Sequence, residues 1–157
     1  MARRLSSGAT MVRLETETRL DATPTEVWNV LSDFARYAEW NPLMLEARGE
    51  VKPGARVAMR VTSPDGSGKR YGFNATLVRA EPGVALEWKG GVPGVLSGLH
   101  YFRLSPDGTG TRLVHGEDFS GFIVTLMGRK RIEGFRPAYE GLNHALAARL
   151  RTRAAAP

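Results

Sequence analysis

Three ionisable side chains in this 157-residue chain are suited to acid–base chemistry: His100, His115 and Glu117. They lie in segments whose large apolar residues recur at every second position. That period of two is typical of a strand with one buried face, so we expect all three groups on the apolar face of a sheet. A neutral histidine can take a proton from the carbon next to a ketone while a second group supplies or holds one, as an aldol-type cyclisation requires.

The same three side chains admit other roles. Burying ionisable groups costs free energy unless they hydrogen-bond, so they could form a structural network or recognise the carbonyl or hydroxyl group of a ligand. Two histidines and a carboxylate also fit a non-haem metal site. Facing strands can gather such groups without a metal, however, and we predict neither a metal nor another cofactor.

The pairing of two predicted strands decides whether these groups meet. Residues 105–110, Ser-Pro-Asp-Gly-Thr-Gly, are typical of a turn between them. The expected facing pairs are Leu104 with Thr111, Phe102 with Leu113, and His100 with His115. A shift by one residue would reverse the faces, and the apolar pair of Phe102 and Leu113 favours this register.

The first part of the chain predicts a strand followed by two short helices. Residues 12–20 alternate between apolar and polar side chains. Thr23 and Glu26 then have the spacing of a capping box, which predicts a helix N-terminus. Residues 33–40 predict a second helix, which must end before Pro42 because the residue before a proline avoids helical angles.

The rest of the chain predicts a meander and a long helix. Residues 43–121 contain short alternating segments joined by turn sequences, which is typical of antiparallel strands. Beyond them one helical stripe is expected, kinked at Pro137 because proline breaks a backbone hydrogen bond. The stripe consists of Phe122, Leu126, Phe135, Tyr139, Leu142 and Leu146. Helices separated from a meander make the fold class α+β.

Composition excludes several classes of protein. Hydrophobic residues make up 42% of the chain and charged residues 24%, values of an ordinary globular domain. The chain has no cysteine, which excludes disulfides and thiolate chemistry. The net charge of +6 is spread out and accompanies no nucleic-acid-binding motif, so we interpret it as solvated surface and expect no nucleic acid partner.

The ends of the chain are predicted to lie outside the folded domain. We expect residues 1–11 to be a disordered lead-in, residues 12–150 to be one ligand-binding domain and residues 151–157 to be a flexible tail. No segment is long and apolar enough for a membrane span, and residues 1–11 contain no apolar core of a secretory signal. A cytoplasmic protein, either a monomer or a homodimer, is the expectation.

Several strings in this order resemble the START-like helix-grip (SRPBCC) superfamily, in particular its polyketide cyclase/dehydrase-like branch. They are Ala22-Thr23-Pro24-Thr25-Glu26-Val27-Trp28, Trp40-Asn41-Pro42, Gly98-Leu99-His100-Tyr101-Phe102-Arg103-Leu104 and Gly110 to Gly121. The resemblance covers about residues 12–149. It implies a curved antiparallel sheet of about seven strands around a long C-terminal helix, with a ligand cavity between them.

Ligand binding is therefore the first functional hypothesis: a small hydrophobic molecule, such as a polyketide, an aromatic compound or a lipid-like metabolite. Trp40 and Trp88 are predicted at the cavity mouth. The predicted lining is Trp40, Met59, Phe73, Trp88, His100, Phe102, His115, Glu117, Phe119, Phe135 and Tyr139. One alternative is a cyclase or dehydratase that uses His100, His115 and Glu117. Another is a chaperone-associated interaction module, which would have little internal volume and an exposed apolar patch.

Overall fold

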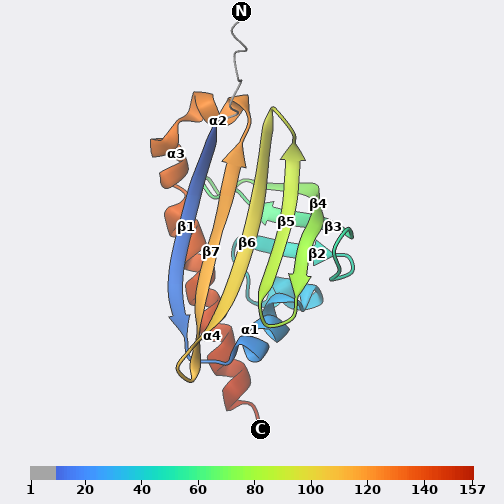
Figure 1. Ribbon diagram of the computed structural model, residues 1–157, viewed down its shortest axis with the longest axis vertical. Helices are drawn as coiled ribbons and strands as arrows, with labels where there is room; N and C mark the ends of the chain where they lie inside the picture. Colours follow the sequence, from blue (N-terminus) through green and yellow to red (C-terminus); the bar gives the residue numbers. More distant parts are fainter. Residues whose placement is uncertain (1–9) are drawn as a thin grey trace, which may run out of the picture.

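The computed structural model describes residues 10–157. Its elements, shown in Figure 1, are β1 (Met11–Leu20), α1 (Pro24–Leu31), η1 (Phe34–Glu39, a 3₁₀ helix), β2 (Met44–Arg48), β3 (Arg56–Thr62), β4 (Arg70–Glu81), β5 (Ala85–Val92), β6 (Leu96–Asp107), β7 (Gly110–Ser120), α2 (Phe122–Met127), α3 (Arg129–Glu133) and α4 (Arg136–Ala155).

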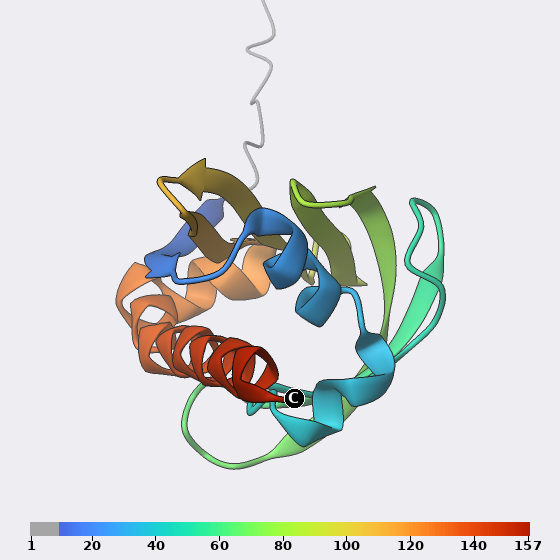
Figure 2. The same ribbon diagram turned by 90° about the horizontal axis from the view of Figure 1, so that it is seen from below.

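The seven strands form one antiparallel sheet in the order β1-β7-β6-β5-β4-β3-β2. Six consecutive strands make the meander, and β1 pairs with β7 to complete the sheet. Figure 2 looks along α4 and shows the sheet curving around this helix. The predicted α+β helix-grip fold is therefore confirmed.

Local sequence signals explain the region between β1 and β2. The predicted capping box is present: the Thr23 amide donates to Glu26 Oε2 at 2.7 Å, and the Glu26 amide donates to Thr23 Oγ1 at 3.3 Å. After η1, the Asn41 side chain accepts hydrogen bonds from the amides of Leu43 and Met44, at 3.1 and 2.8 Å. These bonds turn the chain into β2.

The single kinked helix predicted after Gly121 is wrong, because the structure has three helices there. Gly128 separates α2 from α3 with a φ of +77°, which favours glycine. Pro137 lies in the first turn of α4, where a missing amide hydrogen costs nothing, so it starts the helix and does not kink it. Phe122 and Leu126, placed on the buried stripe by the sequence, are 56% and 78% exposed.

The predicted register of β6 and β7 is also wrong, by two residues. The facing pairs are His100 with Glu117, Phe102 with His115, and Leu104 with Leu113. The strands continue to a tight turn that pairs Asp107 with Gly110, where Gly108 has a φ of +59°. A shift of two residues keeps every side chain on its predicted face, because side chains alternate with a period of two.

Both ends of the domain differ from the predicted boundaries. β1 begins at Met11, inside the expected lead-in, and residues 1–9 lie outside the described part of the chain. α4 continues to Ala155, through most of the expected tail. No helix in residues 10–157 has the length and apolar character needed to cross a bilayer.

Candidate functional site

A cavity of about 90 Å³ lies between the concave face of the sheet and α4. Its wall is mainly apolar, with a polar corner made by His100 of β6, Glu117 of β7 and Tyr139 of α4. No lysine or arginine side chain lines it. The complete lining is Leu43, Met44, Met59, Val61, Thr62, Pro64, Tyr71, Phe73, Trp88, His100, Glu117, Phe119 and Tyr139.

Behind this corner, a buried chain of hydrogen bonds holds His115. The Thr16 hydroxyl donates to the His115 carbonyl oxygen at 2.8 Å, and the Asn143 amide nitrogen donates to Thr16 Oγ1 at 2.9 Å. Asn143 Oδ1 then faces His115 Nδ1 at 2.7 Å. Because Thr16 has used its single hydrogen, the Asn143 oxygen must face the histidine, and His115 Nδ1 must carry a hydrogen.

These hydrogen bonds also determine which ring nitrogen of His100 donates to His115. Burial, followed by the nearby His100, holds the pKa of His115 well below its usual value, so His115 is neutral and its Nε2 has only a lone pair. The two Nε2 atoms lie 2.9 Å apart. His100 Nε2 must therefore donate to His115 Nε2, which directs His100 Nδ1 towards Glu117.

His100 and Glu117 face each other at this corner of the cavity. His100 Nδ1 lies 3.5 Å from Glu117 Oε2, which also accepts a hydrogen bond from the Tyr139 hydroxyl. Burial and the carboxylate of Glu117 also raise the pKa of Tyr139, which keeps its hydroxyl protonated as the donor.

Aromatic packing fixes the ring of His100. The Trp88 indole stacks on it with a centroid distance of 4.8 Å and an interplanar angle of 5°. Tyr139 stacks at 5.7 Å. His100 is only 3% exposed, so a cavity ligand meets the ring at its edge beside Glu117.

Glycines provide the space for the carboxylate. A Cβ atom built on Gly98 would lie 2.0 Å from Glu117 Oε1, and one on Gly90 would lie 2.6 Å from the Phe73 ring. Neither glycine has a positive φ, so a larger residue at either position is opposed by contact with these side chains, which would have to move. Both glycines line a second space of about 180 Å³, which also reaches Glu117 and Phe119.

The structure brings together most of the predicted lining. Met59, Phe73, Trp88, His100, Glu117, Phe119 and Tyr139 line the cavity of about 90 Å³. The other four predicted residues do not. Phe102 and His115 are completely buried behind the wall, Phe135 lines a neighbouring space of about 210 Å³, and Trp40 packs on Tyr37 at a centroid distance of 5.6 Å.

Sequence reasoning missed Asn143, Thr16, Tyr71 and Gly98. Asn143 had a signal: it lies four residues after Tyr139 and three before Leu146, so it is a polar residue on the buried stripe of α4. Thr16 likewise occupies an inward position of β1, where it is 5% exposed. Tyr71 and Gly98 lacked such a signal because their roles depend on neighbouring strands.

The site has no arrangement suited to a metal. Within residues 10–157, no three histidine, aspartate or glutamate side chains converge closely enough to hold an ion. The buried nitrogen and oxygen atoms of His115, Asn143 and Thr16 satisfy one another. The polar side chains that line the cavity are those of Thr62, Tyr71, His100, Glu117 and Tyr139.

Solved structures of other proteins have a similar fold. The aromatase/cyclase Zhui from a Streptomyces species has a TM-score of 0.74 and 19% identity over 94% of this chain and 98% of that chain. A START superfamily protein from Mycobacterium smegmatis has a TM-score of 0.69 and 17% identity over 90% and 98%. At these identities the likeness shows the fold alone.

A third structure, the di-domain aromatase/cyclase StfQ from the steffimycin biosynthetic pathway, has a TM-score of 0.70 and 16% identity. It matches 93% of this chain, which spans about half (53%) of StfQ. No curated protein matches the chain. The sequence model of one family, described as "Polyketide cyclase / dehydrase and lipid transport", matches residues 11–152, and the chain therefore belongs to this family.

Proposed function

We propose that the protein binds a small, mainly apolar and uncharged molecule whose hydroxyl or carbonyl group contacts Glu117. The observation that carries this proposal is the polar corner of His100, Glu117 and Tyr139 in a mainly apolar cavity wall. A few convergent polar groups in an apolar cavity are typical of ligand sites. A ligand carboxylate would meet Glu117 with no lysine or arginine in the lining, which disfavours anions.

The size of the cavity indicates how such a ligand would lie. About 90 Å³ is well below the roughly 300–1,000 Å³ of drug-sized ligand sites. Spaces of about 180 and 210 Å³ adjoin it through the shared residues Tyr71 and Phe119. The polar end of the ligand would therefore occupy the inner cavity, and its apolar remainder would extend into these spaces.

Titration with N-phenyl-1-naphthylamine, a neutral fluorescent probe, tests this arrangement. Val61→Phe should weaken probe binding at least about tenfold, because the larger side chain fills the inner cavity. Val78→Phe adds the same volume at an exposed position and should bind as the parent chain does. Equal probe affinity in both variants would contradict the proposed site. Native mass spectrometry of protein from its source then identifies a natural ligand.

A second candidate function is acid–base catalysis at the same corner. Glu117, whose Oε2 lies 3.5 Å from His100 Nδ1, is placed to act as a base that removes a proton next to a ketone. His115 is completely buried outside the cavity lining, so it would act only by positioning His100.

Hydrogen–deuterium exchange of 1-indanone, followed by NMR in D₂O, tests the catalytic candidate. The parent chain should accelerate exchange next to the ketone, and Glu117→Gln should abolish the acceleration while probe binding persists. An equal exchange rate with and without the parent chain would remove this candidate. It would leave the ligand-binding proposal standing.

A further inference from the structure

One end of the molecule carries a cluster of exposed hydrophobic side chains. Among residues 10–157, nine large hydrophobic residues are exposed, and six of them come from the start of β1, the turn between β5 and β6, and α2. We call these six residues the apolar tip: Met11, Val92, Val95, Leu96, Phe122 and Leu126. Their exposed fractions range from 37% to 78%, so the tip is not an extension of the core.

The fold holds the apolar tip in this exposed position. The amides of Phe122 and Ile123 donate to the carbonyl oxygens of Gly94 and Val95, at 3.0 and 3.1 Å. Gly121 has a φ of +112°, and a Cβ there would lie 2.4 Å from the Val95 carbonyl oxygen. α2 is therefore fixed against the β5–β6 turn. Its Val124 faces the core, and Phe122 and Leu126 face outward.

Cationic side chains flank the tip. Arg129, Lys130 and Arg131 of α3 follow α2 directly and are all exposed. The acidic residue of α3, Glu133, pairs with Arg136 instead, and none of the three cations takes part in an ion pair within the described residues. An exposed apolar surface beside unpaired cations is typical of a surface that lies in the headgroup region of an anionic bilayer.

We propose that the apolar tip docks on a bilayer surface that contains anionic lipids. Phe122, Leu126 and the β5–β6 turn would enter the headgroup boundary, and Arg129, Lys130 and Arg131 would contact lipid phosphate and carboxylate groups. Charge complementarity favours this partner over a second copy of the chain, because two tips would bring their cations together. The exposed side chains of the tip are mostly aliphatic, which disfavours a nucleic acid because bases stack on aromatic rings.

The tip also lies over the route to the proposed ligand site. The space of about 210 Å³ is lined by Leu96 of the tip, by Val124 and Met127 of α2, and by Arg131 of α3. It shares Tyr71 and Phe119 with the inner cavity. A docked molecule could thus receive an apolar ligand from the bilayer without exposing it to water. This consequence rests on the proposed ligand binding, whereas the docking itself does not.

Co-sedimentation with lipid vesicles tests the docking. The full chain should sediment with vesicles of phosphatidylcholine and phosphatidylserine, should bind pure phosphatidylcholine vesicles at least about tenfold more weakly, and should dissociate as salt is raised. Phe122→Glu with Leu126→Glu should abolish binding. Val78→Glu with Val84→Glu introduces the same charges at exposed hydrophobic positions outside the tip and should bind nearly as the parent does.

A second pair of variants separates local charge from net charge. Arg129→Glu with Lys130→Glu should weaken binding to the mixed vesicles about tenfold or more. Arg151→Glu with Arg153→Glu makes the same change in net charge at the opposite end of the molecule, where α4 ends in Figure 1, and should have a much smaller effect. Equal loss in both variants would overturn docking through the tip.

Other occupants of the tip would give different results. The docking proposal is wrong if the chain binds neither vesicle type and its tip has another occupant. Such an occupant would be a second copy, seen as a dimer through Phe122 and Leu126 in sedimentation velocity, or an oligonucleotide or a protein bound at the tip. The experiments can reject the ligand-binding proposal and the docking proposal independently of each other. Val61→Phe should lose the naphthylamine probe but keep vesicle binding, and Phe122→Glu with Leu126→Glu should show the reverse.

Discussion

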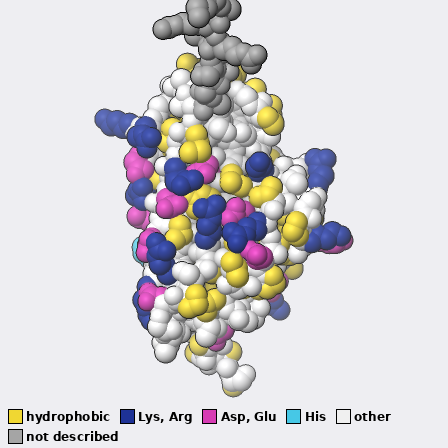
Figure 3. All heavy atoms as spheres, in the orientation of Figure 1, with side chains coloured by type: hydrophobic (Ala, Val, Ile, Leu, Met, Phe, Trp, Pro, Cys, Tyr) yellow, Lys and Arg dark blue, Asp and Glu magenta, His cyan; other side chains and the backbone are white. Residues whose placement is uncertain are grey.

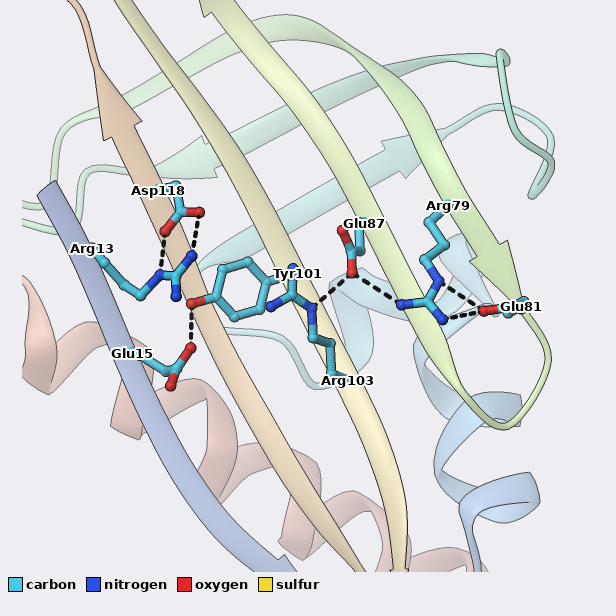
Figure 4. A network of polar contacts seen from close by, with 8 residues as sticks. All are labelled: Arg13, Glu15, Arg79, Glu81, Glu87, Tyr101, Arg103 and Asp118. Atoms are coloured by element: carbon cyan, nitrogen blue, oxygen red, sulfur yellow. Dashed lines mark hydrogen bonds and ion pairs between the residues drawn. The ribbon is translucent and has the colours of Figure 1, made fainter. Parts of the chain in front are cut away.

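The two faces of the sheet carry polar networks of opposite character. On the convex face, shown in Figures 3 and 4, cations and carboxylates alternate: Arg13 makes bonds of 2.7 and 2.9 Å to Asp118, and Arg103 bonds Glu87 at 2.8 Å. Arg103 also lies 4.0 Å from the centroid of the Tyr101 ring. In the cavity on the concave face, Glu117 is the one carboxylate in the lining. It faces a histidine and a tyrosine, and no arginine or lysine lines the cavity.

The convex charges lie in ion pairs at the surface, whereas the Glu117 carboxylate lines a mainly apolar cavity, where it can contact a ligand. The convex pairs are compensated, and their arginines are 49% and 37% exposed, so each pair adds little stability. Their long side chains also cover Tyr101, which is completely buried although it lies on the outer face. The concave network is desolvated, and each of its hydrogen bonds depends on the next. Substitutions should therefore cost much more on the concave face than on the convex face.

The largest loss of stability is expected for Asn143→Leu on the concave face. It removes the partner of His115 Nδ1 and of Thr16 Oγ1 and should lower the free energy of unfolding by about 3 kcal/mol, because both groups stay buried. Arg13→Gln on the convex face should cost about 1 kcal/mol or less, since Arg13 is 49% exposed. Urea denaturation measures both. Similar losses would mean that the two networks do not differ as described.

Gly98→Ala should be the next most costly change. The new methyl group must displace the Glu117 carboxylate, which we expect to cost about 2 kcal/mol and to weaken binding of the naphthylamine probe. Gly72→Ala is the matched control in β4, since its Cβ would lie 3.4 Å from the nearest atom outside its chain neighbours. A Gly98→Ala chain with unchanged stability and probe affinity would show that Glu117 does not need this position.

The concave network should also make stability depend on pH. Because the pKa of His115 is held well below its usual value, the unfolded chain binds one more proton than the folded chain once the pH falls below about 6.5. The free energy of unfolding should then decrease by up to about 1.4 kcal/mol per pH unit as the pH falls. Urea denaturation between about pH 7 and about pH 5 measures this slope.

Two histidine variants provide the control for that slope. His115→Gln should remove from the slope the contribution of about one proton. His144→Gln, on the exposed face of α4, should leave the contribution of His115 to the slope unchanged. An unchanged slope in the His115 variant would contradict a neutral buried His115.

A second small effect, similar to that of Arg13→Gln, is expected for Tyr101→Phe on the convex face. The variant loses the hydrogen bond of 2.6 Å from the Tyr101 hydroxyl to Glu15 and keeps the ring under Arg103. The expected cost is about 1 kcal/mol in thermal or urea unfolding, with no change in probe binding. A loss of probe binding would mean that the two faces are coupled across the sheet.

Much of the fold could be predicted from the sequence because its signals are local. The capping box of Thr23 and Glu26 and the alternation along β1 each depend on residues near in sequence. The same alternation placed His100, His115 and Glu117 on the inner face, and a two-residue error in register did not alter that placement. The resemblance in residue strings then identified the family.

The site itself depended on contacts between distant segments. Which residue faces His100 was decided by where the β6–β7 hairpin turns, and Gly108 allows a tighter turn than the composition of residues 105–110 indicates. The division of the last helical region depended on the φ of Gly128. The partner of His115 came from α4, 28 residues away, and that contact determines which nitrogen of each histidine carries a hydrogen.

The sequence by itself determined the fold class, the family and the side of the sheet on which each chemical group lies, because alternation and capping act over a few residues. Only the tertiary structure decided that His115 is buried between Asn143 and His100, that His100 faces Glu117 at the cavity, and that Phe122 and Leu126 face outward. These properties depend on desolvation and on hydrogen-bond partners from separate elements, which arise only when the sheet closes around α4.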